Sequence, residues 1–146
     1  MMLVKNYMDR SPIHGQGVFA AEWIAKGTRV WEVTPGFDLL MPKATLQLLP
    51  DIQRDFMAHF GYVECATGQL VLCMDHARFM NFSARPNVAR PTDWHGDPLD
   101  LQLALRDIEP GEELLFAVTE DLDAELKIGS QLYRTMLAEY NAHAAI

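Results

Sequence analysis

Short apolar runs separated by Gly, Pro and Asp dominate the hydrophobic pattern of this 146-residue chain. Such runs are typical of small strands, because a strand needs only a few residues to bury one face. The strands expected on this basis are Gly17–Ala21, Arg29–Val33, Tyr62–Cys65, Leu70–Met74, Leu101–Ala104 and Glu113–Val118. A Gly-containing turn at residues 66–69 separates two of these runs, so residues 62–74 are predicted to form a hairpin.

Helical spacing occurs in two places. Asp51 follows Pro50 and is expected to cap a short helix through about residue 60, because Ile52, Phe56 and Phe60 recur every four residues. A weaker helical turn is expected over residues 43–48. Near the end of the chain, Ser130 is expected to begin a helix with an apolar stripe of Tyr133, Met136, Leu137 and Tyr140.

Composition indicates one soluble globular domain over residues 1–146, since apolar residues make up 49% and charged residues 22% of the chain. The net charge of −8 argues against direct nucleic-acid binding, which requires basic side chains. An acidic surface does attract cationic partners such as a Lys-rich peptide or protein tail. Surface solubility explains the same charge, and general priors favour that explanation by about two to one.

Two cysteines, Cys65 and Cys73, are present, and neither a signal peptide nor a membrane-length apolar run is seen. Reduced thiols in the cytoplasm, or in the nucleus of a eukaryote, are therefore expected. The spacing of Cys65, Cys73, His76 and His95 does not match a zinc site, so no structural metal is predicted. A homodimer is compatible with the sequence but not required by it.

The most informative segments are Arg-Phe-Met-Asn-Phe-Ser at residues 78–83, Asn87, and Gly-Glu-Glu-Leu at residues 111–114. Together with His-Gly-Gln-Gly at residues 14–17, they resemble the SET-domain protein methyltransferases. The resemblance implies a mainly β (α+β) fold, a β-clip in which residues 78–87 form a pseudoknot with residues 110–118. It covers a core of residues 9–118, with a short helical insert and a C-terminal helical extension over residues 119–146.

Resemblance to this family implies binding of the methyl donor S-adenosylmethionine. The Gly-x-Gly turn, with His14, Gly15, Gln16 and Gly17, would contact the amino-acid end of the donor through its backbone, since glycines let a ligand approach closely. A tight turn entering a strand is the simpler interpretation of two glycines alone. Further donor-binding candidates from the motif are Arg78, Asn81 and Phe82. Arg78 is expected to pair with Glu112 or Glu113, or to remain solvated.

Two positions depart from the family pattern. Phe82 occupies the usual His position, where its backbone can still bind the donor but no imidazole is present; core packing is an equally good explanation. Val118 occupies the position of the active-site Tyr and carries no hydroxyl. Tyr62 and Phe116 are candidate walls of the lysine channel, each with core packing as an equal or better explanation.

The sequence therefore predicts a donor-binding SET domain that methylates lysine in a protein or peptide. Catalysis would consist chiefly of aligning a neutral amine with the methyl group and excluding water. The alternative is a degenerate SET domain with weak or no activity that binds cofactor or peptide. Phe82 and Val118 are the residues that separate these two hypotheses.

Overall fold

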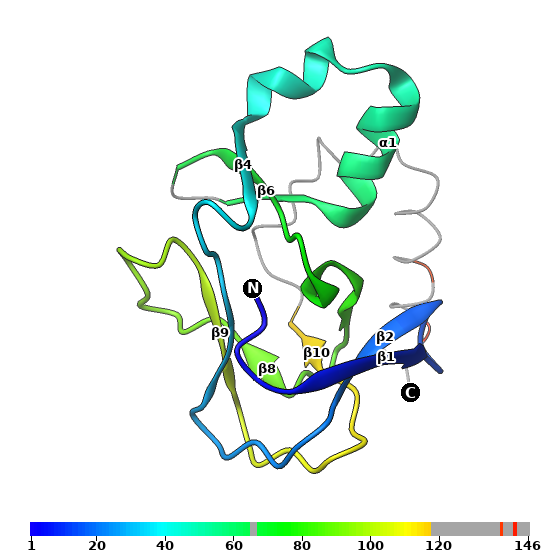
Figure 1. The fold of residues 1–146 in the computed structure, drawn as a ribbon, viewed down its shortest axis with the longest axis vertical. Helices are drawn as coiled ribbons and strands as arrows, with labels where there is room; N and C mark the ends of the chain where they lie inside the picture. The colour runs from blue at the N-terminus through cyan, green and yellow to red at the C-terminus, as the bar shows by residue number, and fades with distance from the viewer. Residues whose placement is uncertain (65–66, 118–137, 139–141, 143–146) are drawn as a thin grey trace.

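The computed structural model describes residues 1–64, 67–117, 138 and 142. Ten short strands, one α-helix and two 3₁₀ turns make up this part of the chain (Figure 1). The strands are β1 Asn6–Arg10, β2 Gln16–Ala20, β3 Arg29–Glu32, β4 Leu39–Pro42, β5 Tyr62–Val63, β6 Gln69–Leu72, β7 Asn81–Phe82, β8 Val88–Ala89, β9 Leu101–Ala104 and β10 Leu115–Phe116. The helical segments are η1 Lys43–Leu48, α1 Asp51–Phe60 and η2 His76–Phe79. The fold is therefore mainly β, as predicted.

Three small sheets hold these strands. β1 pairs with β2, and β4, β6 and β5 form a second, antiparallel sheet in that order. The pairing of β5 with β6 confirms the predicted hairpin over residues 62–74. The largest sheet has the order β3-β9-β8-β10-β7. Strands β1, β4, β7 and β8 were not predicted, because polar residues interrupt β1 and the other three carry no alternating pattern.

The two motif segments lie side by side in the large sheet. β10 runs parallel to both β7 and β8, and Leu115 stands opposite Asn81 in the register. Asn87 fixes this arrangement, because its side chain donates to the Glu113 carbonyl at 2.7 Å and accepts from the Leu115 amide at 2.8 Å. An amide side chain thus replaces a backbone partner. The predicted pairing of residues 78–87 with residues 110–118 is confirmed.

The hydrophobic core consists of two clusters. The larger one joins the first strands to the large sheet and includes the fully buried Val18, Val30, Val88, Ile108 and Leu114. The smaller one lies where α1 meets the β4-β6-β5 sheet and is built on Leu46, Met57, Val63, Leu70 and Leu72. Gly61 ends α1 at this junction, and an added Cβ there would lie 2.7 Å from the Met57 carbonyl oxygen. The helical insert is therefore attached to the sheet by its own small core.

Helix α1 corrects the sequence prediction in two respects. Pro50 is the N-cap residue, and Asp51 lies in the first turn, where it pairs with Arg54 at 2.6 Å instead of capping the helix. The buried face is formed by Met57 and Ala58, whereas Ile52 is 80% exposed. Four-residue spacing identified the helix but not its buried side, because the sheet contacts the C-terminal turn of α1. The predicted turn over residues 43–48 is confirmed as η1.

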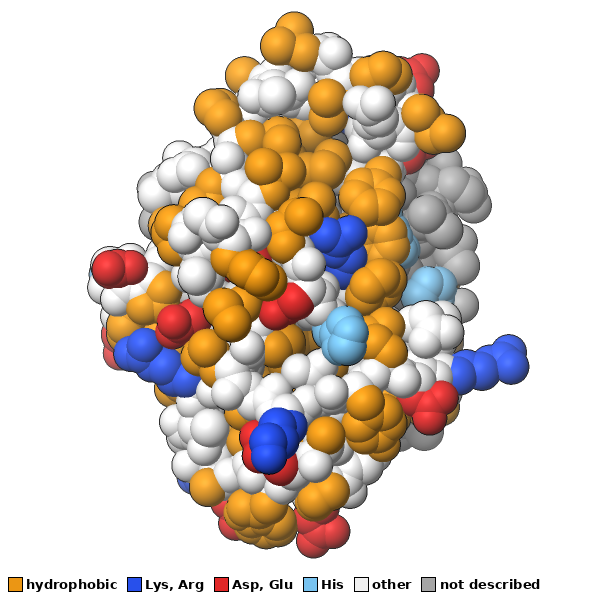
Figure 2. All heavy atoms as spheres, in the orientation of Figure 1, with side chains coloured by type: hydrophobic (Ala, Val, Ile, Leu, Met, Phe, Trp, Pro, Cys, Tyr) orange, Lys and Arg blue, Asp and Glu red, His pale blue; other side chains and the backbone are white. Residues whose placement is uncertain are grey.

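One face of the molecule carries many hydrophobic side chains, which gather over β4, β6 and α1 (Figure 2). The exposed large hydrophobic residues of β4, η1, α1 and the segment after β6 are Leu39, Leu48, Ile52, Phe56 and Met74. No helix within the described residues is long and apolar enough to cross a membrane. The predicted C-terminal helix from Ser130 and the family-tyrosine position Val118 lie outside the described residues.

Candidate functional site

The Gly-x-Gly turn belongs to a tight loop that joins β1 to β2. Ser11 organises the start of this loop: its hydroxyl oxygen accepts from the Ile13 amide at 2.9 Å, and its own amide donates to the Gly15 carbonyl at 2.8 Å. The Ser11 hydroxyl also donates to Oε2 of Glu113 at 3.0 Å, although these residues are far apart in sequence. The loop is thus attached to the second motif segment by a buried serine.

Asn81 makes a second connection between the loop and the motifs. Its side-chain nitrogen donates to the carbonyl oxygens of His14 and Gln16 at 3.0 and 3.1 Å and to Oε1 of Glu113 at 2.9 Å. Three acceptors around one atom identify it as the nitrogen of the amide, because the oxygen cannot donate. Asn81 Oδ1 takes part in none of these hydrogen bonds. We call Ser11, Gly17, Asn81 and Glu113 the loop anchor.

Gly17 leaves the space that Glu113 occupies. A Cβ added at Gly17 would lie 2.2 Å from Oε1 of Glu113 and 3.1 Å from the Ser11 Cβ. The first contact is closer than atoms can approach and the second is tight, and the carboxylate is held in place by Ser11 and Asn81. The second glycine of the turn is therefore required for packing within the protein, whereas the sequence interpretation assigned it to the ligand.

Gly15 has a different role. Its φ of +49° lies in the left-handed region, and an added Cβ would meet no heavy atom within 4 Å. The open space beside this backbone is the environment expected for the binding of a ligand by main-chain groups. The His14 and His59 rings stand edge to face at a centroid distance of 6.4 Å, so α1 contacts the same loop.

Phe82 and Phe116 lie next to each other in the large sheet. Phe82 is buried, and its ring meets that of Phe116 edge to face at a centroid distance of 5.9 Å. β7, which carries Asn81 and Phe82, is the last strand of its sheet within the described part of the chain. The apolar ring of Phe82 thus packs in the interior against Phe116.

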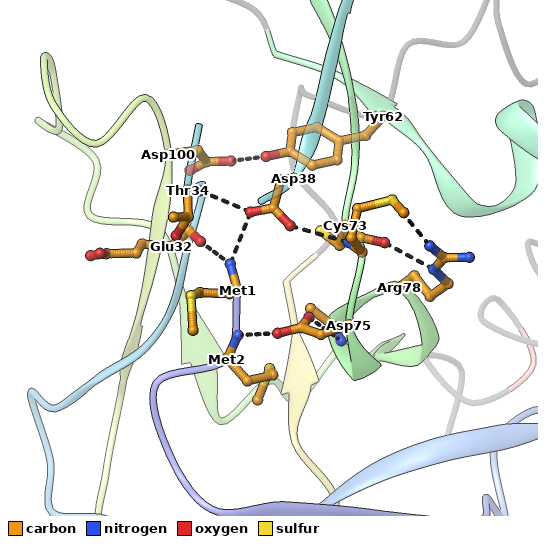
Figure 3. Close-up of polar contacts among 12 residues, drawn as sticks. Met1, Met2, Glu32, Thr34, Asp38, Tyr62, Cys73, Asp75, Arg78 and Asp100 are labelled. Atoms are coloured by element: carbon orange, nitrogen blue, oxygen red, sulfur yellow. Dashed lines mark hydrogen bonds and ion pairs between the residues drawn. The ribbon is translucent and has the colours of Figure 1, made fainter. Parts of the chain in front are cut away.

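Arg78 does not pair with either glutamate of the second motif, which corrects the sequence prediction. Its Nε donates to the Cys73 carbonyl at 2.9 Å, and its guanidinium lies 6.0 Å from the centre of the Phe56 ring (Figure 3 shows the first contact). Arg78 lies on η2, and this short turn brings its side chain within reach of the Cys73 carbonyl, which precedes the turn. Arg78 therefore joins η2 to β6 and α1.

Glu112 and Glu113 have opposite surroundings despite being adjacent. Glu112 is partly exposed and pairs with Arg106 at 2.6 Å. A hydrogen bond from Arg106 lowers the pKa of the Glu112 carboxyl, and the same contact raises the pKa of Arg106. Glu113, also partly exposed, belongs to the loop anchor and accepts from Ser11 and Asn81. The motif thus contributes one carboxylate paired with an arginine and one bound by neutral donors.

Tyr62 belongs to a separate group of buried polar residues. Its hydroxyl donates to Oδ2 of Asp100 at 2.8 Å (Figure 3). The Arg90 guanidinium lies 3.5 Å from Asp100 and 3.5 Å from Glu64. Glu64 is fully buried and also accepts two hydrogen bonds from Thr67 at 2.8 Å. We call Tyr62, Glu64, Arg90 and Asp100 the acid cluster.

A third polar group is centred on Asp38, near the acid cluster (Figure 3). Its buried carboxylate accepts from the amides of Thr34 and Met74 and pairs with the amino group of Met1 at 3.0 Å. Burial and the nearby Asp38 raise the pKa of the Cys73 thiol to about 12. Cys73 therefore remains a protonated thiol at neutral pH, which makes it a poor nucleophile and metal ligand.

Sequence reasoning missed Ser11 and the residues Glu64, Arg90 and Asp100. Ser11 precedes the glycine turn without any spacing rule that would connect it to Glu113. The three charged residues stand beside short strands and turns, where charged side chains are normally solvated. Their burial is decided by strand pairing distant in sequence. Among the described residues, no group of three or more His, Cys, Asp or Glu could hold a metal ion.

Comparison with known proteins agrees with this geometry. A profile of the SET domain family matches residues 15–117, which include the glycine loop, β7 and β10. The chain therefore belongs to the SET domain family. No relative matches it among curated protein sequences.

Solved structures share the fold at low sequence identity. A Plasmodium falciparum protein described as a histone methyltransferase is 18% identical, with a TM-score of 0.57 over 82% of this chain and 96% of that one. A humanized mutant of the Chaetomium thermophilum Polycomb Repressive Complex 2, bound to the inhibitor GSK126, is 21% identical, with a TM-score of 0.58 over 81% of this chain and 15% of that one. KRYPTONITE, solved with mCHG DNA and SAH, is 20% identical, with a TM-score of 0.56 over 80% and 24%.

Proposed function

We propose that the protein is an S-adenosylmethionine-dependent lysine methyltransferase acting on proteins or peptides. The observation that carries the proposal is the loop anchor, in which one amide, that of Asn81, holds the Gly-x-Gly loop against the second motif segment. Family membership and the KRYPTONITE structure with SAH support the choice of donor.

The residues around the loop fit the amino-acid end of the donor. Asn81 Oδ1 accepts no hydrogen bond from the loop anchor, so it is suited to accept from the ammonium group of a methionine-like ligand. Main-chain groups of residues 14–16 border the open space at Gly15. Arg78 is left out of this set, because its contacts lie with Cys73 and Phe56.

The bound donor would supply an electrophilic methyl group on a sulfonium. The lysine nitrogen uses its lone pair to form the new N–C bond, the C–S bond breaks with its electrons on sulfur, and the excess proton leaves to solvent. The protein's part is to orient the amine and to exclude water. Tyr62 and Phe116, which both pack against the larger core cluster, are the proposed channel residues.

Donor binding can be tested with Asn81→Ala and a matched control, Asn87→Ala. Both variants lose hydrogen bonds beside Glu113, but only Asn81 faces the glycine loop. Loss of a hydrogen bond to a charged ligand group should weaken the affinity for S-adenosylmethionine about 10–100-fold in Asn81→Ala. Asn87→Ala should change this affinity by less than about threefold, although it also destabilises the fold.

Calorimetric titration, together with thermal unfolding of each variant, provides the measurement. A parent protein that gives no heat of binding at millimolar donor would remove the proposal. Equal loss of affinity in both variants would show that Asn81 acts through stability alone.

Val118 is proposed to limit the rate of methyl transfer, because an aliphatic side chain occupies the family position of an orienting tyrosine hydroxyl. Val118→Tyr should raise the rate by up to about 10²–10³, the effect of one well-placed hydrogen-bond group in other enzymes. Overpacking could reduce stability by about 1–3 kcal/mol, so unfolding is measured in parallel. Transfer of labelled methyl to mixed cellular proteins is the assay. A stable, donor-binding Val118→Tyr variant with the parent's rate would contradict this role.

The second candidate is a SET domain that binds its donor without transferring methyl. The observation in its favour is the burial of Phe82 against Phe116, which places apolar rings where the family carries an imidazole. This candidate would be favoured if the parent and the Val118→Tyr variant both bind S-adenosylmethionine but neither transfers labelled methyl to any acceptor.

A further inference from the structure

The acid cluster contains two carboxylates that proteins seldom bury. Asp100 is 2% exposed and Glu64 is fully buried, while Arg90 lies between them. Removing a carboxylate from water is unfavourable unless hydrogen bonds or an opposite charge compensate for it. Apolar side chains would fill the same space without the free-energy cost of removing charges from water. We therefore looked for a role of the cluster besides packing.

The backbone holds Asp100 rigidly. It stands directly before β9, and its carbonyl accepts from the Val33 amide at 2.9 Å, which attaches it to the end of β3. Its carboxylate is therefore a fixed acceptor toward which the Tyr62 hydroxyl points (Figure 3). The Tyr62 ring also rests edge to face against Trp31 at a centroid distance of 6.3 Å. Ring and hydroxyl are thus both oriented by neighbours.

Tyr62 lies close to the proposed donor site. It follows α1 by two residues, and the last turn of α1 touches the glycine loop and η2. His59 meets the His14 ring of the glycine loop, and Phe60 meets Phe79 at a centroid distance of 5.4 Å, two residues before Asn81. The segment that carries Tyr62 is therefore anchored to the loop and to η2.

We infer that Asp100, supported by Arg90, is a positioning residue for a catalytic Tyr62; this inference rests on the proposed function. By accepting a hydrogen bond from the Tyr62 hydroxyl, Asp100 turns the lone pairs of the Tyr62 oxygen away from itself and strengthens them as acceptors. An oxygen held in this way can accept a hydrogen bond from the nitrogen of a substrate lysine and orient it. The cluster thus supplies one orienting hydroxyl, which is separate from the one that Val118 leaves out at the family-tyrosine position.

A double-mutant cycle with Tyr62→Phe and Asp100→Asn tests this dependence. Residues that act through one another give non-additive effects, whereas independent residues add. Each single variant should reduce kcat about 10–100-fold, with KM for the acceptor nearly unchanged. Asp100→Asn should cause no further loss in a protein that already carries Tyr62→Phe. Methyl transfer from labelled S-adenosylmethionine to mixed cellular proteins provides the rates.

Asp38→Asn is the matched control. Asp38 is another buried aspartate, and none of its hydrogen bonds goes to Tyr62. The Asp38→Asn variant should be less stable than the parent but should keep the parent's kcat at a temperature where every variant is folded. If Asp100→Asn is too unstable to assay, Arg90→Lys takes its place in the cycle, because a lysine keeps the positive charge but not the guanidinium contacts.

The outcomes separate the inference from the function on which it rests. A parent that transfers no methyl overturns both. An active parent in which Asp100→Asn leaves kcat unchanged, or reduces it equally with and without Tyr62, overturns the inference alone. A comparable loss of kcat in Asp38→Asn would also overturn it, because the effect would then belong to any buried carboxylate.

Discussion

The loop anchor and the acid cluster are both buried polar groups, but they depend on different kinds of contact. In the loop anchor, Asn81 and Ser11 link main-chain carbonyls and amides to one carboxylate, that of Glu113. In the acid cluster, Arg90 stands between the side chains of Glu64 and Asp100. The loop anchor fixes the path of a loop. The acid cluster fixes the orientation of side chains that stand at the ends of β5, β8 and β9.

This difference explains why the sequence motifs contained the loop anchor except Ser11, but only Tyr62 of the acid cluster. A loop held by backbone contacts needs glycines and an amide at set positions, which leaves a short motif. A cluster of opposite charges needs only that the charges meet in space, and many spacings achieve this. A cluster of opposite charges is therefore found from the burial and ion pairs of its residues in the structure.

The largest effect is expected from removing the charge at the centre of the acid cluster. Arg90→Gln should lower the free energy of unfolding by about 3–5 kcal/mol, because it leaves buried carboxylates without their guanidinium. The matched variant Arg29→Gln breaks an exposed pair with Glu32 and should cost less than about 1 kcal/mol. Urea unfolding measures both. Similar losses in the two variants would mean that burial adds nothing to the Arg90 pairs.

A smaller effect is expected from filling the space beside the loop anchor. Gly17→Ala places a Cβ against Glu113 and should cost about 1–3 kcal/mol, as overpacking does elsewhere, together with donor affinity. Gly15→Ala meets no neighbour and should cost only the strain of a positive φ, about 1 kcal/mol. Thermal unfolding and donor titration distinguish them. If Gly15→Ala proves the more damaging of the two, the role assigned to Glu113 is wrong.

The smallest effect concerns the adjacent glutamates. Glu112→Gln should cost less than about 1 kcal/mol at neutral pH, because its pair with Arg106 is exposed to solvent. The pKa of Glu112 is lowered in the folded protein, so its contribution is present above the ordinary carboxyl pKa and is lost as pH falls below it. Glu113→Gln should cost more at neutral pH, since two donors face its carboxylate. Unfolding of both variants at neutral and acidic pH tests this order.

The sequence by itself determined the family, the mainly β architecture and the proximity of the two motif segments. Those features follow from residues whose local chemistry is specific, such as Asn87 in place of a backbone partner and the glycines of the turn. The hairpin over residues 62–74 was also predictable, because its turn and apolar runs are contiguous. A structural feature can be predicted from local sequence when one short segment contains both the turn residues and the strands that they bring into contact.

Tertiary structure alone decided which polar residues are buried together. Arg78 turned toward Cys73 and not toward the glutamates, and Asp100 met Tyr62, because strand order sets which side chains come within reach. The exposed Ile52 on α1 has the same explanation, since only the last turn of the helix meets the sheet. Electrostatic and packing contacts depend on distances in space, and residues far apart in sequence acquire those distances only when the chain folds.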